Sequence, residues 1–439
     1  MTPMLDLDSI DAEIVDARTK GFPPDVAPLP LAAIGAQRWN LLRGDLPFPQ
    51  AVIKASALAH NHAWMRDFTA ATGVLLAPHG KTTMAPQIFA QQLAAGAWGI
   101  TVATVQQLGI CVHFGVRRVI MANQLIGPRE VTGVIRLREH HPDLEFHFLV
   151  DSVAQLAMIE TIAAQHTMSR PLTALLELGV PGGRTGCRDG AEAVVVARAI
   201  AASPAVTLSG IECYEGLKVT GNSEEDAAVV GALMATIKSV ALACDRADLF
   251  AGPAIILSAG GSAAFDIVAR ELPMQLSRPV QTILRSGCYV THDSGFYARM
   301  LEGVKARSGA AWQTRPGLRP ALEVWSRVQS RPETGLAILT MGKRDASFDI
   351  ELPIAQTWLR PGLDVAPRPT PDGWKIEAMN DQHAYLRVPS GGAAAADELG
   401  VGDLVGCGIS HPCTTFDKWR LLFTVDDAYR VTGAIRTFF

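Results

Sequence analysis

The 439-residue sequence has little of what marks secreted, membrane-spanning or polyanion-binding proteins. The segment Met1–Ile10 lacks a basic stretch followed by an apolar core, so we expect no signal peptide. No apolar run approaches the roughly 18 residues that a membrane helix needs. The formal net charge is only −4 and no block of like charge occurs, which argues against nucleic-acid and membrane partners.

Cysteines are few, scattered and odd in number. No C-x-x-C pair occurs, and this pattern is typical of a reducing cytoplasm rather than of a disulfide framework. We therefore expect a cytoplasmic protein. The seven residues are Cys111, Cys187, Cys213, Cys244, Cys288, Cys407 and Cys413.

The first two thirds of the chain alternate short apolar runs with longer helical stretches. Apolar residues recur at helical spacing in Ala85–Ala95, Val153–Gln165 and Asp226–Ala243. Eight mainly apolar strands, each followed by a helix, are typical of a (β/α)8 TIM-type barrel, and an open doubly wound sheet is the alternative. The expected strands are 51–53, 74–76, 100–102, 119–121, 146–150, 172–178, 208–211 and 255–257.

After about Arg307 the pattern changes to alternating runs rich in Pro and Gly, which predicts a C-terminal antiparallel β-domain. We expect its strands within 321–328, 336–340, 384–388, 404–409 and 421–425. The predicted organisation is therefore an N-terminal extension over residues 1–45 that packs on the main domains, a barrel over 46–305 and a β-domain over 306–439.

A lysine follows the second expected strand, in Pro78-His79-Gly80-Lys81-Thr82-Thr83. The Gly-Lys-Thr triplet invites a P-loop interpretation, but Leu75 stands where that loop needs its first glycine, so we reject it. A lysine at the C-terminal end of a barrel strand points into the site face. Burial there would depress its pKa and free the amine for attack on a carbonyl. The alternative is an ordinary exposed lysine that starts a loop.

Two further motifs lie late in the expected barrel, the first of them directly after the strand 255–257. In Ser258-Ala259-Gly260-Gly261-Ser262, backbone N–H groups and hydroxyls could converge on a phosphate ester, although a tight turn would look the same. In Leu284-Arg285-Ser286-Gly287-Cys288-Tyr289, Arg285 could approach the ring nitrogen of a cofactor and Tyr289 could contact a phosphate. The alternatives are a surface ion pair and a core tyrosine.

The β-domain carries the sequence Ser410-His411-Pro412-Cys413-Thr414-Thr415. In an extended segment His411 and Cys413 point to one side, and imidazole with thiolate is a preference of zinc. Two protein ligands would leave positions open for a substrate oxygen, and His383 is a candidate helper. A buried cysteine beside a chance histidine is the alternative.

Taken together and in this order, these motifs resemble the D-serine dehydratase/D-threonine aldolase group of pyridoxal-phosphate enzymes, whose barrel is similar to that of alanine racemase. The resemblance covers about Pro49 to the C-terminus and includes Ala51–Asn61 as first strand and helix. It implies pyridoxal 5'-phosphate as cofactor, a divalent metal with zinc favoured, and a homodimer.

The resemblance also implies roles for single residues. Lys81 would carry the cofactor as a Schiff base and remove the α-proton, and His411 with Cys413 would bind the metal. An arginine at position 285 resembles alanine racemases, in which it faces the pyridine nitrogen and weakens the ring as an electron sink. The expected cofactor-binding residues are Lys81, His79, Arg184, Tyr214, Ser258, Gly260, Gly261, Ser262, Arg285, Gly287 and Tyr289.

The implied reaction is cleavage of a D-β-hydroxy amino acid. The His-x-Cys pair resembles dehydratases, which favours D-serine dehydration to pyruvate and ammonia, while D-threonine aldolase-type cleavage is the first alternative. A racemase would need a second base, for which the β-domain offers Tyr385 and Tyr429. A non-catalytic pyridoxal-phosphate-binding protein is a further alternative. Asn123-Gln124 and Glu212 with Tyr214 are candidates for reading the substrate.

Overall fold

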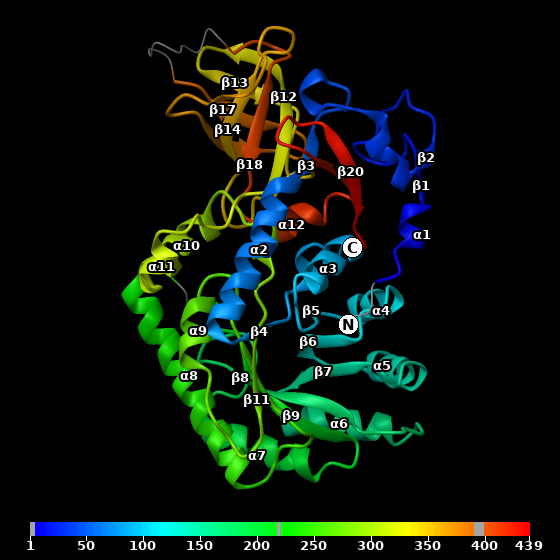
Figure 1. The fold of residues 1–439 in the computed structure, drawn as a ribbon, viewed down its shortest axis with the longest axis vertical. Coiled ribbons are helices and arrows are strands. Elements are labelled where there is room, and N and C mark those ends of the chain that lie inside the picture. Colours follow the sequence, from blue (N-terminus) through cyan, green and yellow to red (C-terminus); the bar gives the residue numbers. More distant parts are fainter. Residues whose placement is uncertain (1–4, 217–219, 221, 390–398) are drawn as a thin grey trace.

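Eight short parallel strands form the lower part of the molecule in Figure 1. The computed structural model describes residues 5–216, 220, 222–389 and 399–439. The hydrogen-bonded order is β4-β11-β10-β9-β8-β7-β6-β5. The bounds are β4 (Leu75–Leu76), β5 (Ile100–Val102), β6 (Arg118–Gln124), β7 (Glu145–Val150), β8 (Leu172–Leu178), β9 (Val206–Cys213), β10 (Ile255–Ala259) and β11 (Val280–Leu284).

The first and last strands of this path are also joined. Trp98 N–H donates to Leu76 O at 2.7 Å, and Thr101 N–H donates to Pro78 O at 2.9 Å. These bonds link the β4 segment to the β5 segment, so the sheet closes on itself. The predicted barrel is therefore confirmed, and the open doubly wound alternative is wrong.

Helices cover the outside of the barrel, and several begin at a side chain that caps the free N–H groups of the first turn. Thr104, Ser152 and Asp189 accept such bonds at the starts of α4, α6 and α7. The helices are α3 (Pro86–Ala94), α4 (Val105–His113), α5 (Pro128–His140), α6 (Val153–Ala163), α7 (Gly190–Ala202), α8 (Ser223–Arg246), α9 (Phe265–Glu271), α10 (Phe296–Arg307) and α11 (Ala310–Gln313).

Helix α8 is the one described helix that is long and apolar enough to cross a membrane, by length and composition only. Its stretch Glu224–Arg246 reaches a mean hydropathy of 1.9, so the prediction that no apolar run approaches this length is wrong. The helix packs against the barrel between α7 and α9, and Val230, Ile237 and Cys244 on its inner face are buried. It therefore serves as an outer barrel helix.

A ten-stranded sheet forms the upper body in Figure 1. Its central path runs β15-β14-β18-β12-β13-β17-β16, with antiparallel neighbours, and all five predicted strands are confirmed. Its strands from this part of the chain are β12 (Leu322–Glu333), β13 (Leu336–Leu339), β14 (Ile354–Leu359), β15 (Arg368–Pro369), β16 (Lys375–Met379), β17 (Ala384–Arg387), β18 (Leu404–Gly408), β19 (Leu421–Val425) and β20 (Val431–Arg436).

One strand of this sheet comes from the beginning of the chain. Strand β3 (Gln50–Lys54) pairs antiparallel with β12 and parallel with β19, and Figure 1 shows it in the upper body. The prediction of 51–53 as the first barrel strand is therefore wrong, and β11 is the barrel strand that was missed. A short apolar run buried on both faces has the same pattern in either sheet, so the sequence could not assign it. Helix α2 (Ala55–Thr72) follows β3 and leads down to the barrel.

The N-terminal segment touches both bodies. Asp6 N–H donates to Phe114 O at 3.2 Å on the barrel side, and Val431 N–H donates to Trp39 O at 2.8 Å on the sheet side. The segment includes α1 (Asp8–Asp11), β1 (Ile14–Val15), β2 (Leu29–Pro30) and the 3-10 helices η1 (Leu31–Gln37) and η2 (Leu41–Arg43).

Candidate active site

A cavity of about 480 Å³ lies where the C-terminal ends of the barrel strands face the β-domain. In a TIM-type barrel this is the end that carries the chemistry. Its lining includes His79 and Lys81 after β4, Tyr214 after β9 and Arg285 after β11, together with His411 and Cys413 from the second body. Motifs that lie more than 300 residues apart in the chain thus meet in one cavity.

Lys81 lies in the 3-10 helix η3 (Gly80–Thr82) directly after the β4 segment. Gly80 permits this close turn, since a Cβ there would lie 2.8 Å from Ile100 Cγ2 and 2.9 Å from the ring of Phe89. The Lys81 side chain is exposed in the open cavity rather than buried, so the predicted desolvation of its amine is not found. Within the described part of the chain no hydrogen bond or ion pair engages this amine. It is available to a ligand.

Arg285 is a fixed cation in the cavity wall, with an exposed fraction of only 5%. It donates to Ser258 Oγ and Cys213 O, each at 2.8 Å, and pairs with Glu212 at 2.7 Å. Burial raises the pKa of Glu212 to about 8, although the nearby Arg285 acts in the opposite direction. The alternative of a surface ion pair is therefore wrong.

The glycine motif after β10 forms an anion-binding turn. The N–H groups of Gly260 and Gly261 donate to the two carboxylate oxygens of Glu215, at 3.1 and 2.6 Å. Gly260 has a φ of +92°, a conformation that favours glycine. The Glu215 carboxylate here stands in for an external anion such as a phosphate, because both present paired oxygens to adjacent N–H groups. Ser262 Oγ lies beside them and accepts from Cys288 N–H at 3.2 Å.

Two predicted phosphate ligands point elsewhere. Ser258 is fully buried in β10, where its hydroxyl donates to Ile283 O at 3.0 Å. Tyr289 is 3% exposed, and its hydroxyl lies 3.4 Å from Gln92 Nε2, outside the cavity lining. The predicted phosphate contact of Tyr289 is therefore wrong, and its alternative, a core tyrosine, is what the structure contains. Gly260 does not line the cavity itself, and its N–H group reaches only the Glu215 carboxylate.

The remaining predicted residues lie on the cavity wall. The Arg184 guanidinium lies over the Tyr214 ring at 5.4 Å, and burial raises the pKa of Tyr214 to about 12. Burial, together with the charges of Lys81 and Arg285, holds the pKa of His79 well below its ordinary value. Gly287 is needed because a Cβ there would lie 2.6 Å from His79 O.

Two acidic residues of the site were not singled out by the sequence patterns. Glu177 is 3% exposed in β8 and accepts from Thr185 Oγ1 at 2.7 Å and from Gln124. An acid inside the apolar run 172–178 was the signal that could have revealed it. Glu215 follows Tyr214 directly, but nothing in its spacing indicated that it would reach the glycine turn.

A cysteine of the barrel joins the predicted metal pair. The donor atoms of Cys288, His411 and Cys413 all lie within 4.8 Å of one another, whereas His383 does not belong to the cluster. The Sγ atoms of Cys288 and Cys413 are 3.6 Å apart. Hydrogen bonding between these thiols lowers the pKa of Cys413 and raises the pKa of Cys288.

His411 is held by Asp349, since its Nδ1 lies 2.6 Å from Asp349 Oδ2. Burial alone would lower the pKa of His411, but Cys413 and Asp349 outweigh it and raise the pKa to about 9. The imidazole therefore lies next to both Cys413 and the Asp349 carboxylate.

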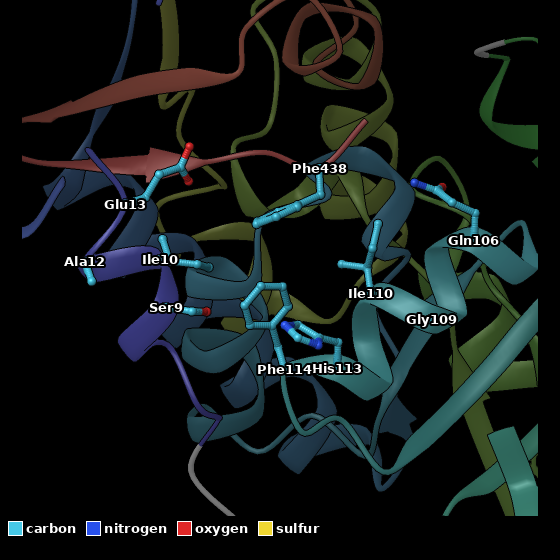
Figure 2. Close-up of a pocket in the computed structure, with 10 residues that line it drawn as sticks. All are labelled: Ser9, Ile10, Ala12, Glu13, Gln106, Gly109, Ile110, His113, Phe114 and Phe438. Carbon is cyan, nitrogen blue, oxygen red and sulfur yellow. The ribbon is translucent and has the colours of Figure 1, made fainter. Parts of the chain in front are cut away.

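A second cavity, shown in Figure 2, lies between the N-terminal segment and helix α4. It is lined mainly by apolar groups such as Ile10, Ile110 and Phe438. Its one carboxylate, Glu13, is paired with Arg436 at 2.9 Å. With few convergent polar groups, this cavity is a weaker candidate for catalysis than the barrel mouth.

The sequence is similar to a family and to proteins of known activity. A family model described as a serine dehydratase domain matches residues 321–425. The D-threonine aldolase of Arthrobacter sp. is 25% identical over 379 residues, which cover 86% of this chain and 89% of that protein. The D-threo-3-hydroxyaspartate dehydratase of Delftia sp. (strain HT23) is 31% identical over 141 residues, covering 32% of this chain and 36% of that protein.

Solved structures share the fold. The D-threonine aldolase from Filomicrobium marinum superposes with a TM-score of 0.71 at 21% identity, over 90% of this chain and 95% of that one. The Delftia dehydratase superposes with a TM-score of 0.68 at 23% identity, over 91% of this chain and 99% of that one. An alanine racemase from Bacillus anthracis superposes with a TM-score of 0.54 at 13% identity, over 89% of this chain and 98% of that one. The predicted resemblance is thus confirmed: the chain is similar to D-threonine aldolase and D-threo-3-hydroxyaspartate dehydratase, and it has an alanine racemase-like fold.

Proposed function

We propose that the protein is a pyridoxal-phosphate- and metal-dependent lyase that acts on D-β-hydroxy amino acids. The leading reaction is D-serine dehydration to pyruvate and ammonia. This proposal rests on three features that lie together at one cavity: the Lys81 amine, the anion-binding turn at Gly261, and the His411/Cys413 pair. The homologues support the substrate class, because their names specify D-threonine and D-threo-3-hydroxyaspartate, both β-hydroxy amino acids.

The residues of the cavity fit the cofactor. The Gly260 and Gly261 N–H groups already bind a carboxylate and would hold the phosphate, with Ser262 beside them. Lys81 Nζ would bind the cofactor and accept the α-proton of the substrate. Arg285, locked by three partners, supplies a fixed positive charge in the wall. When bound, the cofactor supplies an electron sink for the α-carbon.

The metal pair supports β-elimination of a hydroxyl. His411 and Cys413 would hold a divalent ion, for which zinc suits imidazole and thiolate. Such an ion supplies Lewis-acid activation of the β-hydroxyl as a leaving group. A solved structure of similar fold is described as a cysteine-to-alanine mutant of D-threo-3-hydroxyaspartate dehydratase in the metal-free form, which is consistent with a metal-binding site in that protein.

Aldol cleavage is the second candidate function. It is favoured by the broad similarity to D-threonine aldolase, which spans most of both chains. Racemisation is less well supported, because Tyr385 is bonded to Asn380 at 3.1 Å and Tyr429 to Glu323 at 3.1 Å, both outside the cavity lining.

The test compares D-serine, D-threonine and D-threo-3-hydroxyaspartate as substrates of the cofactor- and metal-loaded protein. Release of a keto acid and ammonia supports dehydration. Release of glycine and an aldehyde, the products of breaking the Cα–Cβ bond, supports aldol cleavage. Lys81→Ala should remove the visible absorbance of the bound cofactor and all turnover, and a chelator should stop turnover reversibly. A cofactor band without turnover of any of these substrates would contradict the lyase proposal and indicate a binding protein, or a racemase if chiral analysis detects inversion.

We further propose a homodimer in the cytoplasm. Two observations support it: the family resemblance implies the dimer, and the seven cysteines are free thiols, as a reducing compartment would keep them. Light scattering of the purified protein tests the dimer, and a monomer at assay concentration would contradict it.

A further inference from the structure

A second thiol stands beside the His411/Cys413 pair, and it comes from the other body of the molecule. Cys288 begins η5 (Cys288–Val290) after barrel strand β11, whereas Cys413 begins α12 (Cys413–Phe416) in the β-domain. All three donor residues line the cavity that contains Lys81. Any ion that binds all three would therefore join the barrel to the β-domain at the mouth of the active site.

The spacing of the two sulfurs suits one tetrahedral ion. With metal–sulfur bonds of about 2.3 Å and tetrahedral angles, two thiolates on one zinc lie ~3.8 Å apart. The Sγ atoms of Cys288 and Cys413 are 3.6 Å apart. A disulfide would need ~2.05 Å. A hydrogen bond between thiols has a similar length; the imidazole donor atom, within 4.8 Å of both sulfurs, completes a set of three candidate ligand atoms.

The imidazole is oriented as a ligand. Its Nδ1 is bonded to Asp349 Oδ2 at 2.6 Å, and the other oxygen of that carboxylate accepts from Thr414 Oγ1 at 2.7 Å. This arrangement leaves Nε2 of His411 for an ion. Metal-bound histidines usually have such a carboxylate behind them, which fixes the ring and its tautomer.

We propose that Cys288, His411 and Cys413 form a three-ligand zinc site, with Asp349 as the positioning residue of the imidazole and a fourth position open to the cavity. This assignment rests on the proposed metal dependence and extends it by a third protein ligand, Cys288, from the barrel. Two thiolates and an imidazole select soft or borderline ions such as Zn²⁺ over Mg²⁺, Ca²⁺ and Mn²⁺. Three protein ligands and one open position are the arrangement of catalytic rather than structural zinc.

The experiment uses the full-length protein, stripped of metal under reducing conditions and reloaded with Co²⁺ or Zn²⁺. The Co²⁺ protein should show thiolate-to-metal charge-transfer absorbance for two sulfurs, and Cys288→Ser should lose about half of it. In competition with a chelator, the Zn²⁺ affinity of Cys288→Ser should fall more than about 100-fold, because a direct ligand is lost. The Zn²⁺ affinity of Asp349→Asn, which changes a residue that positions a ligand, should fall by only about 10–100-fold. Cys244→Ala, which removes a buried thiol of α8, is the matched control and should change neither the Co²⁺ absorbance nor the Zn²⁺ affinity.

X-ray absorption of the unmutated zinc protein keeps the test independent of any folding defect in the variants. Two sulfur neighbours at about 2.3 Å support the site, and one sulfur overturns it. Unchanged Co²⁺ absorbance and Zn²⁺ affinity in Cys288→Ser would also overturn it, while leaving the two-ligand metal of the proposed function in place. A protein that binds neither ion would overturn the metal dependence itself.

Discussion

At the scale of single residues, Glu215 holds the position at which the glycine turn after β10 would receive a phosphate. Its two oxygens accept from Gly260 and Gly261. A phosphate must displace this carboxylate, and bonds from N–H groups to an ionised acceptor are roughly twice as strong as bonds between neutral groups. We therefore expect Glu215→Gln to bind pyridoxal phosphate about tenfold more tightly, or ~1.4 kcal/mol, in titrations of the cofactor-free protein.

The control for this prediction is Glu302→Gln, which removes one negative charge from the exposed face of α10. It should leave cofactor affinity within about twofold. Equal or weaker cofactor binding by Glu215→Gln would show that Glu215 supports the phosphate site rather than competing for it.

Single residues also show which parts of the candidate site could be predicted from the sequence and which could not. Lys81 and Gly261 were predicted because each lies shortly after an expected strand, and parallel strands place their ends together. Arg285 was predicted from its own motif, although the strand before it was missed. Cys288 was quoted only as part of a motif, because its partner lies 125 positions away across two bodies. Tyr289 was misassigned because a short 3-10 turn rotates successive side chains to different sides, and no pattern in the sequence reports that rotation.

At the scale of elements, the pairing of strand β3 with the upper sheet can be tested by mutation. Ile53 is fully buried and lies opposite Leu322 of β12 and Thr424 of β19. Ile53→Ala should cost about 2–5 kcal/mol of unfolding free energy, because it leaves a cavity between these strands. Native-state hydrogen exchange should then be faster at the amides of β12 and β19 than in the barrel strands β8 and β9.

Ile255→Ala is the matched change in barrel strand β10, where the side chain is equally buried. It should accelerate exchange in β9 and β11, its neighbours in the sheet, more than in β12. If Ile53→Ala loosened the barrel strands first, the assignment of β3 to the upper sheet would be contradicted.

Most elements could be predicted from apolar runs and their turns, and the exceptions have a common cause. Seven of the eight expected barrel strands lie in the barrel, whereas 51–53 lies in the other sheet. Strand β11 was overlooked as a strand because its run Val280–Leu284 contains Gln281 and Thr282, which interrupt the apolar pattern. Pairing partners depend on contacts distant in the chain, and local periodicity carries no information about them.

At the scale of the whole molecule, buried histidines should make stability depend on pH. Burial lowers the pKa of His62 to about 4 from its ordinary value of 6.5, so the folded state binds this proton less readily than the unfolded chain. Stability is therefore fully present above about pH 6.5 and is lost as the pH falls toward 4. We expect His62 alone to account for about 2 kcal/mol of loss between pH 7 and pH 5.

Urea unfolding of the protein and of His62→Leu at both pH values checks this expectation. The variant keeps an apolar side chain of similar size against Tyr289, so its loss between pH 7 and pH 5 should be smaller by about 2 kcal/mol. Burial also lowers the pKa of His292 to about 4, so this residue should account for a similar part of the remaining loss of stability. An identical pH dependence in the two proteins would contradict the assignment.

The pairing of β3 with β12 has a consequence for synthesis on the ribosome. The two strands are about 270 residues apart, so at about 5–20 residues per second the first emerges roughly 15 to 55 s before its partner exists. During that interval the apolar segment Ala51–Ile53, completely buried in the finished fold, has no sheet to join. Newly made chains therefore carry an unpaired strand edge throughout the time in which the barrel forms, and chaperones that cover such edges have their longest opportunity at this segment.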